Sequence, residues 1–195
     1  MKPPPIELIV IGASAGGVEA LLSLLGALPA GYALPVVACL HLMPRRESQL
    51  ASVLAHRLTL PVREPQDKEP VRPGNVYVAR ADYHLLVERD RHFAFSSEPP
   101  VSYARPSIDV LMMSAADAYG AAVAGVLLTG ANSDGAVGMA AIHDAGGLTI
   151  VQLPQDADVP TMPEAAIARC QPDHILALKD IPPMLLQLAS GGRGV

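Results

Sequence analysis

The order of the apolar segments is the feature of this chain that most constrains its fold, because strand patterns and helix patterns alternate. Residues 7–11 form a short, β-branched apolar run that predicts a buried strand. After a glycine-rich loop, leucines recur at helical spacing from Val18 until Pro29 ends the pattern. A second apolar run at 34–40 and a second helical pattern at 50–58 follow. This order predicts parallel strands joined by right-handed crossovers.

Between residues 61 and 95 the alternation is interrupted. Three or four short apolar stretches are separated by turn sequences at 67–68, 73–75 and 89–91. Such sequences are typical of hairpins. We therefore expect this region to add an antiparallel hairpin edge to the parallel sheet.

The alternation returns after residue 100. A helical pattern begins at Ile108, with Ser107 as its expected N-cap. Further strands are predicted at 121–128 and 148–152, and helices at 136–145, 163–170 and 181–189. The sequence thus predicts one α/β domain over residues 1–195, with its core at about 6–188. We expect a doubly wound, mostly parallel sheet with helices on both faces.

Composition excludes several classes of protein. Half of the residues are hydrophobic and only 17% are charged, which is typical of a packed globular domain. The net charge of −5 and the absence of a basic stripe argue against nucleic-acid binding. Cys39 and Cys170 form no disulfide framework, and the histidines show no metal-ligand spacing, so we expect a reducing compartment and no metal. No apolar run approaches the roughly 18 residues of a membrane span. We expect a cytoplasmic protein without membrane insertion.

Polar residues follow three of the predicted parallel strands. Ser14 comes after the first strand, within the loop 12–17, and His41 comes directly after the second. Asp134 lies in the loop 129–135 that follows the strand ending at residue 128. Ligands bind at the carboxyl ends of strands in such sheets. A serine, a histidine and an aspartate at one edge are the set that nucleophilic acyl transfer requires.

Each of these side chains has a chemical role in this interpretation. The Ser14 hydroxyl is too weak an acid to attack alone, so it needs His41 as a base within hydrogen-bond reach. Asp134 would orient the imidazole and stabilise its protonated form. The glycines around Ser14 allow a tight turn and leave the amides of Ala15 and Gly16 free to hold an oxyanion.

Two further residues are candidates for substrate binding. The loop that contains Ala131 could supply a second oxyanion donor. Arg105 precedes the helix that begins at residue 108, where it could reach the rim of the site.

Each motif taken alone has a simpler interpretation. The loop 12–17 also fits a phosphate-binding turn, although it lacks the G-x-G-x-x-G spacing, and the second strand ends at His41 instead of a ribose-binding acid. His41 alone is more often a structural histidine, and 132–135 alone is typical of a turn and helix cap. Their joint placement after three strands favours a hydrolase.

Six motifs in order resemble the catalytic domain of the chemotaxis protein-glutamate methylesterases. They are I-G-A-S-A-G-G at 11–17, H-x-M-P at 41–44, P-G-x-x-Y-x-A at 73–79, R-P-S-x-D-V-L at 105–111, L-T-G-A-N-S-D-G-A-x-G-M at 128–139 and T-M-P-E-A-A at 161–166. The resemblance covers nearly the whole chain. It is much more specific than a G-x-S-x-G sequence alone.

The resemblance implies a function. Ser14 would be the nucleophile, His41 the general base and acid, and Asp134 the orienting carboxylate. The substrate would be a glutamate γ-methyl ester on the cytoplasmic helices of a chemoreceptor, with release of methanol, and receptor glutamines would also be deamidated. No cofactor or metal is required.

Three departures from the family pattern keep alternatives open. No receiver domain precedes the first strand, so the chain is either a stand-alone form or an excised piece, and a separate regulatory protein is a candidate partner. Ala131 stands where many members have methionine, and Glu164 stands where many have arginine. The alternatives are a catalytically idle module of the same fold that binds a receptor or partner, and a hydrolase of another ester.

Overall fold

A seven-stranded, fully parallel sheet forms the centre of the computed structural model, which describes residues 4–41 and 49–191. The strand order is β3-β4-β2-β1-β7-β8-β9. The strands are β1 (Leu8–Ala13), β2 (Val36–Leu40), β3 (Val62–Arg63), β4 (Val76–Val78), β7 (Val123–Leu127), β8 (Leu148–Gln152) and β9 (His174–Leu176). Met43 and Pro44 of the H-x-M-P motif lie outside the described residues.

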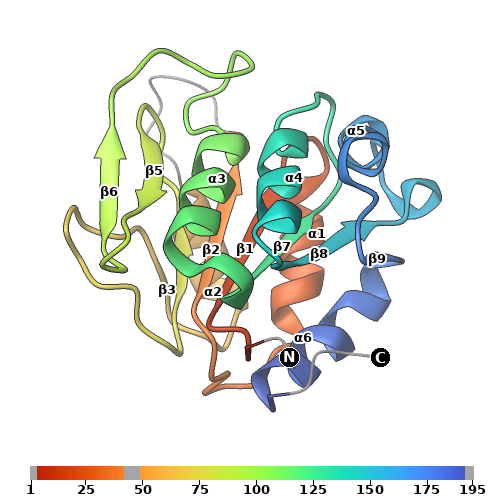
Figure 1. The fold of residues 1–195 in the computed structure, drawn as a ribbon. Helices are drawn as coiled ribbons and strands as arrows, with labels where there is room; N and C mark the ends of the chain where they lie inside the picture. The colour runs from red at the N-terminus through yellow and green to blue at the C-terminus, as the bar shows by residue number, and fades with distance from the viewer. Residues whose placement is uncertain (1–3, 42–48, 192–195) are drawn as a thin grey trace.

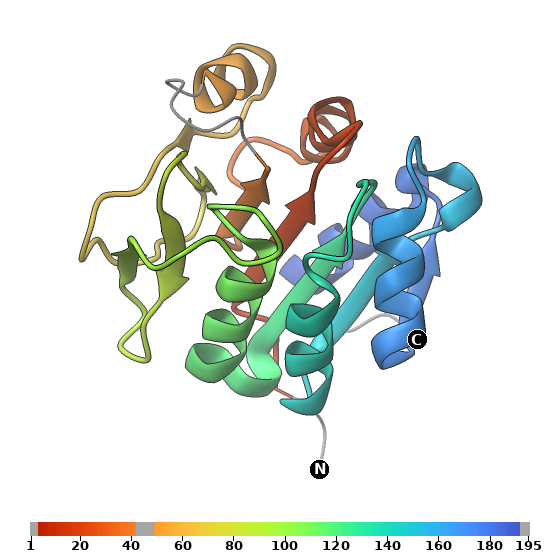
Figure 2. The ribbon, with the colours of Figure 1, turned by 90° about the horizontal axis from the view of Figure 1, so that it is seen from above.

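Helices cover both faces of this sheet, as Figures 1 and 2 show. They are α1 (Gly17–Gly26), α2 (Leu50–Arg57), α3 (Ile108–Tyr119), α4 (Ala136–Asp144), α5 (Thr161–Cys170) and α6 (Ile181–Ala189). Helices α3 and α4 lie side by side on one face, and α1 and α2 lie on the other. The predicted fold class, an α/β doubly wound domain, is confirmed.

The alternation of side chains along β1 explains the two layers. Ile9 and Ile11 belong to a buried cluster with leucines of α1 and α6, whereas Leu8 and Val10 belong to a second cluster with α3, α4 and α5. Successive side chains of a strand point to opposite faces. A strand that is apolar at every position therefore needs helices on both sides.

The region between α2 and α3 differs in detail from the sequence prediction. The antiparallel hairpin is confirmed as β5 (His84–Val87) and β6 (Phe93–Ser96). It forms a two-stranded sheet of its own, however, and packs against α3. The edge of the main sheet is instead formed by β3 and β4, which run parallel to β2. Turn sequences mark where the chain reverses, but they do not specify which strands pair.

The strand order also determines where a site can form. β1 lies between β2 and β7, so the chain leaves it in one direction towards β4 and later returns to its other side. A crevice forms at such a switch point, outside the carboxyl ends of the strands. Within the described residues, no helix is long and apolar enough to span a membrane.

Candidate active site

Ser14 occupies the sharp turn between β1 and α1. Its backbone N–H donates to the carbonyl of Thr129 at 2.9 Å, which ties the turn to the end of β7. Gly16 closes the turn with a φ of +76°, and a Cβ at this position would come within 2.5 Å of Asp158. Glycine is therefore required for both conformation and space. The turn leaves the Ser14 side chain half-buried at the edge of the sheet.

The His41 ring lies between the side chains of Ser14 and Asp134. It directly follows β2, and its Nδ1 lies 3.0 Å from Ser14 Oγ, while its Nε2 lies 2.7 Å from Asp134 Oδ2. Because an ionised carboxylate can only accept, the ring proton is on Nε2 and the lone pair of Nδ1 faces the hydroxyl. The ring is thus turned the opposite way from that of the serine proteases, whose Nε2 faces the serine.

Asp134 is fully buried, and hydrogen bonds surround its carboxylate. Besides His41, it accepts from the backbone N–H groups of Ile108 at 2.7 Å and Asp109 at 3.0 Å, and from the Ser107 hydroxyl at 2.9 Å. Burial alone would raise the pKa of Asp134, but these hydrogen bonds together hold the pKa below its usual value. The carboxylate at the N-terminus of α3 is therefore ionised at neutral pH.

A second buried aspartate, Asp109, makes the reciprocal contact. It lies in the first turn of α3, and its Oδ1 accepts from the N–H groups of Gly135 and Gly138 at the start of α4, both at 2.8 Å. A Cβ at Gly138 would lie only 2.5 Å from Met112, so this glycine lets the two helices approach closely. Burial, reinforced by the nearby charge of Asp134, raises the pKa of Asp109 to about 6.

The expected oxyanion donors differ in their availability. Within the described part of the chain, the N–H groups of Ala15 and Gly16 donate to no other group. Thr129 Oγ1 donates to the Ala15 carbonyl at 2.9 Å, which fixes the orientation of the 15–16 peptide. In the second loop, the Gly130 N–H is already bonded to the Val159 carbonyl, whereas that of Ala131 has no partner among residues 4–41 and 49–191.

Arg105 is held by its own loop. Its Nη1 donates to the carbonyls of Ser97 at 2.8 Å and Glu98 at 3.1 Å, between β6 and α3. The arginine therefore stabilises the loop that leads to Ser107. A role for Arg105 in substrate binding stays a prediction.

One side chain that contacts the histidine was not expected from the sequence. Asn132, interpreted as a turn residue, places its Nδ2 3.5 Å from His41 Nδ1. The support that Ser107 and Asp109 give to Asp134 was also not expected. The signal for these two was present in the R-P-S-x-D motif, where a helix cap is followed two residues later by an acidic side chain.

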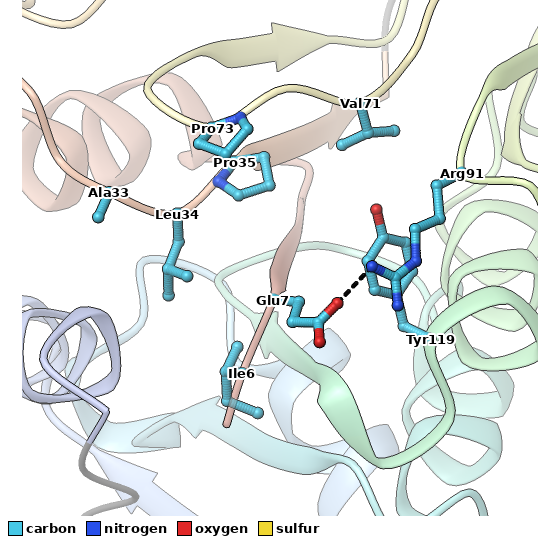
Figure 3. A pocket seen from close by; sticks show the side chains of 9 residues that line it. All are labelled: Ile6, Glu7, Ala33, Leu34, Pro35, Val71, Pro73, Arg91 and Tyr119. Carbon is cyan, nitrogen blue, oxygen red and sulfur yellow. Dashed lines mark ion pairs between the residues drawn. The ribbon is translucent and has the colours of Figure 1, made fainter. Parts of the chain in front are cut away.

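The described residues contain no group of three or more acidic, histidine or cysteine side chains that could hold a metal ion. A hollow of about 280 Å³ lies at the opposite edge of the sheet, at the amino ends of β1 and β2 (Figure 3). There Arg91 pairs with Glu7 and stacks on Tyr119, with its guanidinium 4.6 Å from the ring centre. This hollow contains none of the three side chains at the carboxyl edge.

Comparison with known proteins identifies the family of this chain. Residues 9–185 match the CheB methylesterase family. The chain belongs to this family. A putative protein-glutamate methylesterase/protein-glutamine glutaminase of Leptospira interrogans is 41% identical over 93% of this chain and 94% of its own length. The crystal structure of the Thermotoga maritima CheB methylesterase catalytic domain superposes with a TM-score of 0.89, at 31% identity over 94% of this chain and 98% of that domain.

Other relatives are longer. A protein-glutamate methylesterase/protein-glutamine glutaminase of Anaeromyxobacter dehalogenans is 38% identical over 94% of this chain, but the chain spans only 53% of that protein. The family expected from the six motifs is confirmed, and with it the class of protein-glutamate methylesterase hydrolases.

Proposed function

We propose that this chain is a serine hydrolase that removes methyl groups from glutamate γ-methyl esters on the cytoplasmic helices of chemoreceptors. The observation that carries the proposal is the continuous hydrogen-bonded chain from Ser14 Oγ through His41 to the buried carboxylate of Asp134. The names of the relatives support the substrate class and extend it to glutamine side chains.

In the first half of the reaction, Ser14 Oγ attacks the ester carbonyl carbon and passes its proton to His41 Nδ1. The carbonyl oxygen becomes an oxyanion, which the N–H groups of Ala15 and Gly16, unbonded among the described residues, would hold from the turn after Ser14. Asp134 stabilises the imidazolium through Nε2. The bond to the methoxy oxygen then breaks, this oxygen takes the proton from Nδ1, and methanol leaves.

The second half of the reaction repeats these steps with water. Water attacks the carbonyl carbon of the acyl-enzyme and gives a proton to His41 Nδ1. The bond to Ser14 Oγ then breaks, and Oγ recovers its proton from Nδ1. The product is the γ-carboxylic acid of glutamate, which releases its remaining proton to water and becomes the carboxylate. No metal or cofactor takes part in the proposed steps.

Labelling with a fluorophosphonate tests whether Ser14 is the nucleophile. The wild type is compared with Ser14→Ala, His41→Ala and Asp134→Ala. We expect rapid labelling of the wild type, none of Ser14→Ala, almost none of His41→Ala and slow labelling of Asp134→Ala. If the wild type labels no faster than Ser14→Ala, the chain is a binding module and not a hydrolase.

The substrate is tested separately, by methanol release from methylated fragments of chemoreceptors. Rapid labelling without methanol release would instead indicate a hydrolase of another ester.

We further propose a separate regulatory protein as a partner. This proposal is tested by comparing methanol release by the wild type with and without candidate response regulators.

A further inference from the structure

Asn132 contacts the catalytic base His41 but has no role in the proposed mechanism. It lies in the loop between β7 and α4 and is partly buried. The backbone N–H of Asp134 donates to Asn132 Oδ1 at 3.1 Å, which fixes the amide so that its Nδ2 faces His41. The side chain therefore presents an N–H donor, and not a carbonyl, to the reacting region.

This donor lies beside the ring nitrogen that must protonate the leaving group. His41 Nδ1 must come within about 3 Å of the leaving atom in order to protonate it. Because Asn132 Nδ2 is 3.5 Å from Nδ1, an atom at that place can also lie within hydrogen-bond distance of Nδ2. The amide of Asn132 can therefore donate to an atom that His41 Nδ1 protonates.

An ester and an amide respond differently to a donor at this place. In the tetrahedral intermediate of a methyl ester, the methoxy oxygen has two lone pairs, of which one takes the proton of His41 and the other can accept from Asn132. In the intermediate of a glutamine, the nitrogen has a single lone pair, which the proton uses, and its remaining N–H bonds face the donor.

We propose that Asn132 is a specificity-determining residue that favours methyl-ester hydrolysis over amide hydrolysis by donating a hydrogen bond to the leaving oxygen. This inference rests on the proposed function. Both substrates give the same glutamyl ester of Ser14, so the discrimination must occur while the acyl-enzyme forms. A change at Asn132 therefore alters the ratio of kcat/KM for the ester to kcat/KM for the amide. The hydrolysis of the acyl-enzyme is the same step for both substrates.

The test compares one receptor peptide carrying a γ-methyl ester, a γ-methyl thioester or a glutamine at the same position. The thioester is included because sulfur is a weak hydrogen-bond acceptor and thioesters react readily. The first variant, Asn132→Asp, keeps the acceptor for the Asp134 N–H but loses the N–H donor that faces His41. The second, Asn132→Ala, loses both the acceptor and the donor. Asn75→Asp makes the same chemical change in an exposed turn before β4 and is the matched control.

We expect the ester-to-amide and ester-to-thioester ratios of kcat/KM to fall by roughly threefold to tenfold in Asn132→Ala, the usual value of one hydrogen bond. The ester-to-amide ratio should fall further in Asn132→Asp, because a carboxylate accepts from the leaving N–H. Asn75→Asp should leave every ratio unchanged. A general loss of folding would lower all three rates together and leave the ratios unaltered.

Three results would overturn the inference. If the wild type is acylated on Ser14 but the variants keep the wild-type ratios of kcat/KM, Asn132 does not discriminate between leaving atoms. If amide cleavage is too slow to measure, an unchanged ester-to-thioester ratio leads to the same conclusion. If no substrate acylates Ser14 in the wild type, the proposed function fails, and the inference fails with it.

Discussion

The N-termini of helices α3 and α4 present the same arrangement twice, with opposite consequences. At the start of α3, the N–H groups of Ile108 and Asp109 bind the carboxylate of Asp134, which belongs to the loop before α4. At the start of α4, the N–H groups of Gly135 and Gly138 bind the carboxylate of Asp109, which belongs to α3. Asp109 of α3 therefore binds the start of α4, and Asp134, in the loop that leads into α4, binds the start of α3.

The difference between the two aspartates lies in their further partners. Asp134 also accepts from His41 Nε2 and Ser107, and its pKa is lowered despite burial. Burial dominates at Asp109, whose pKa rises to about 6. The same helix-end geometry thus yields an ionised orienting group at one end and a structural clamp at the other. The clamp holds α3 against α4, and so keeps the donors of Asp134 in place.

The largest expected effect concerns the acid that faces the histidine. Asp134→Asn removes the charge and favours the wrong tautomer of His41, so kcat for an activated ester should fall by about 10⁴-fold, as when the triad aspartate of a serine protease is replaced. Asp109→Asn keeps an acceptor for Gly135 and Gly138 and should retain most of the activity. Steady-state kinetics checks both. Equal losses in the two variants would contradict the division of roles.

A smaller effect is expected on folding. Asp109→Ala removes both hydrogen bonds to the start of α4, and loss of such a cap typically costs about 0.5–2 kcal/mol. We expect the free energy of unfolding, measured in urea at neutral pH, to fall by about this amount. Asp109→Asn is the control and should lose less. A variant as stable as the wild type would show that the α4 cap contributes nothing.

The smallest expected effect is a difference in pH dependence. The ordinary pKa of aspartate is about 4, and that of Asp109 is about 6 in the folded protein. Between these values the folded state binds more protons than the unfolded state, so the contribution of Asp109 to stability is full below about pH 4 and is lost as the pH rises through about 6. Asp134, with its lowered pKa, contributes in the opposite direction.

Urea unfolding of the wild type and Asp109→Asn at several pH values between about 4 and 7 isolates this contribution. The stability of the wild type relative to the variant should decrease as the pH rises. A relative stability that is constant or increases over this range would mean that the pKa of Asp109 is not raised.

Several elements could be predicted closely from local patterns. β8 and α6 have the bounds that the sequence indicates, and Ser107 caps α3, with its Oγ accepting from the Val110 N–H. The short strand β9 was missed, because three partly exposed residues carry no clear periodicity. β3 and β4 were assigned to an antiparallel edge, because turn residues indicate a reversal of the chain but not the partner of each strand.

By itself, the sequence determined the alternation of strands and helices, the edge at which Ser14, His41 and Asp134 gather, and the family. These follow from apolar periodicity and from what comes after each strand. Only the tertiary structure decided which ring nitrogen faces the serine, that Asp134 caps α3 while Asp109 caps α4, and that Asn132 faces the base. Such contacts join residues 25 to 93 positions apart, and they depend on rotamers and helix packing that periodicity does not record.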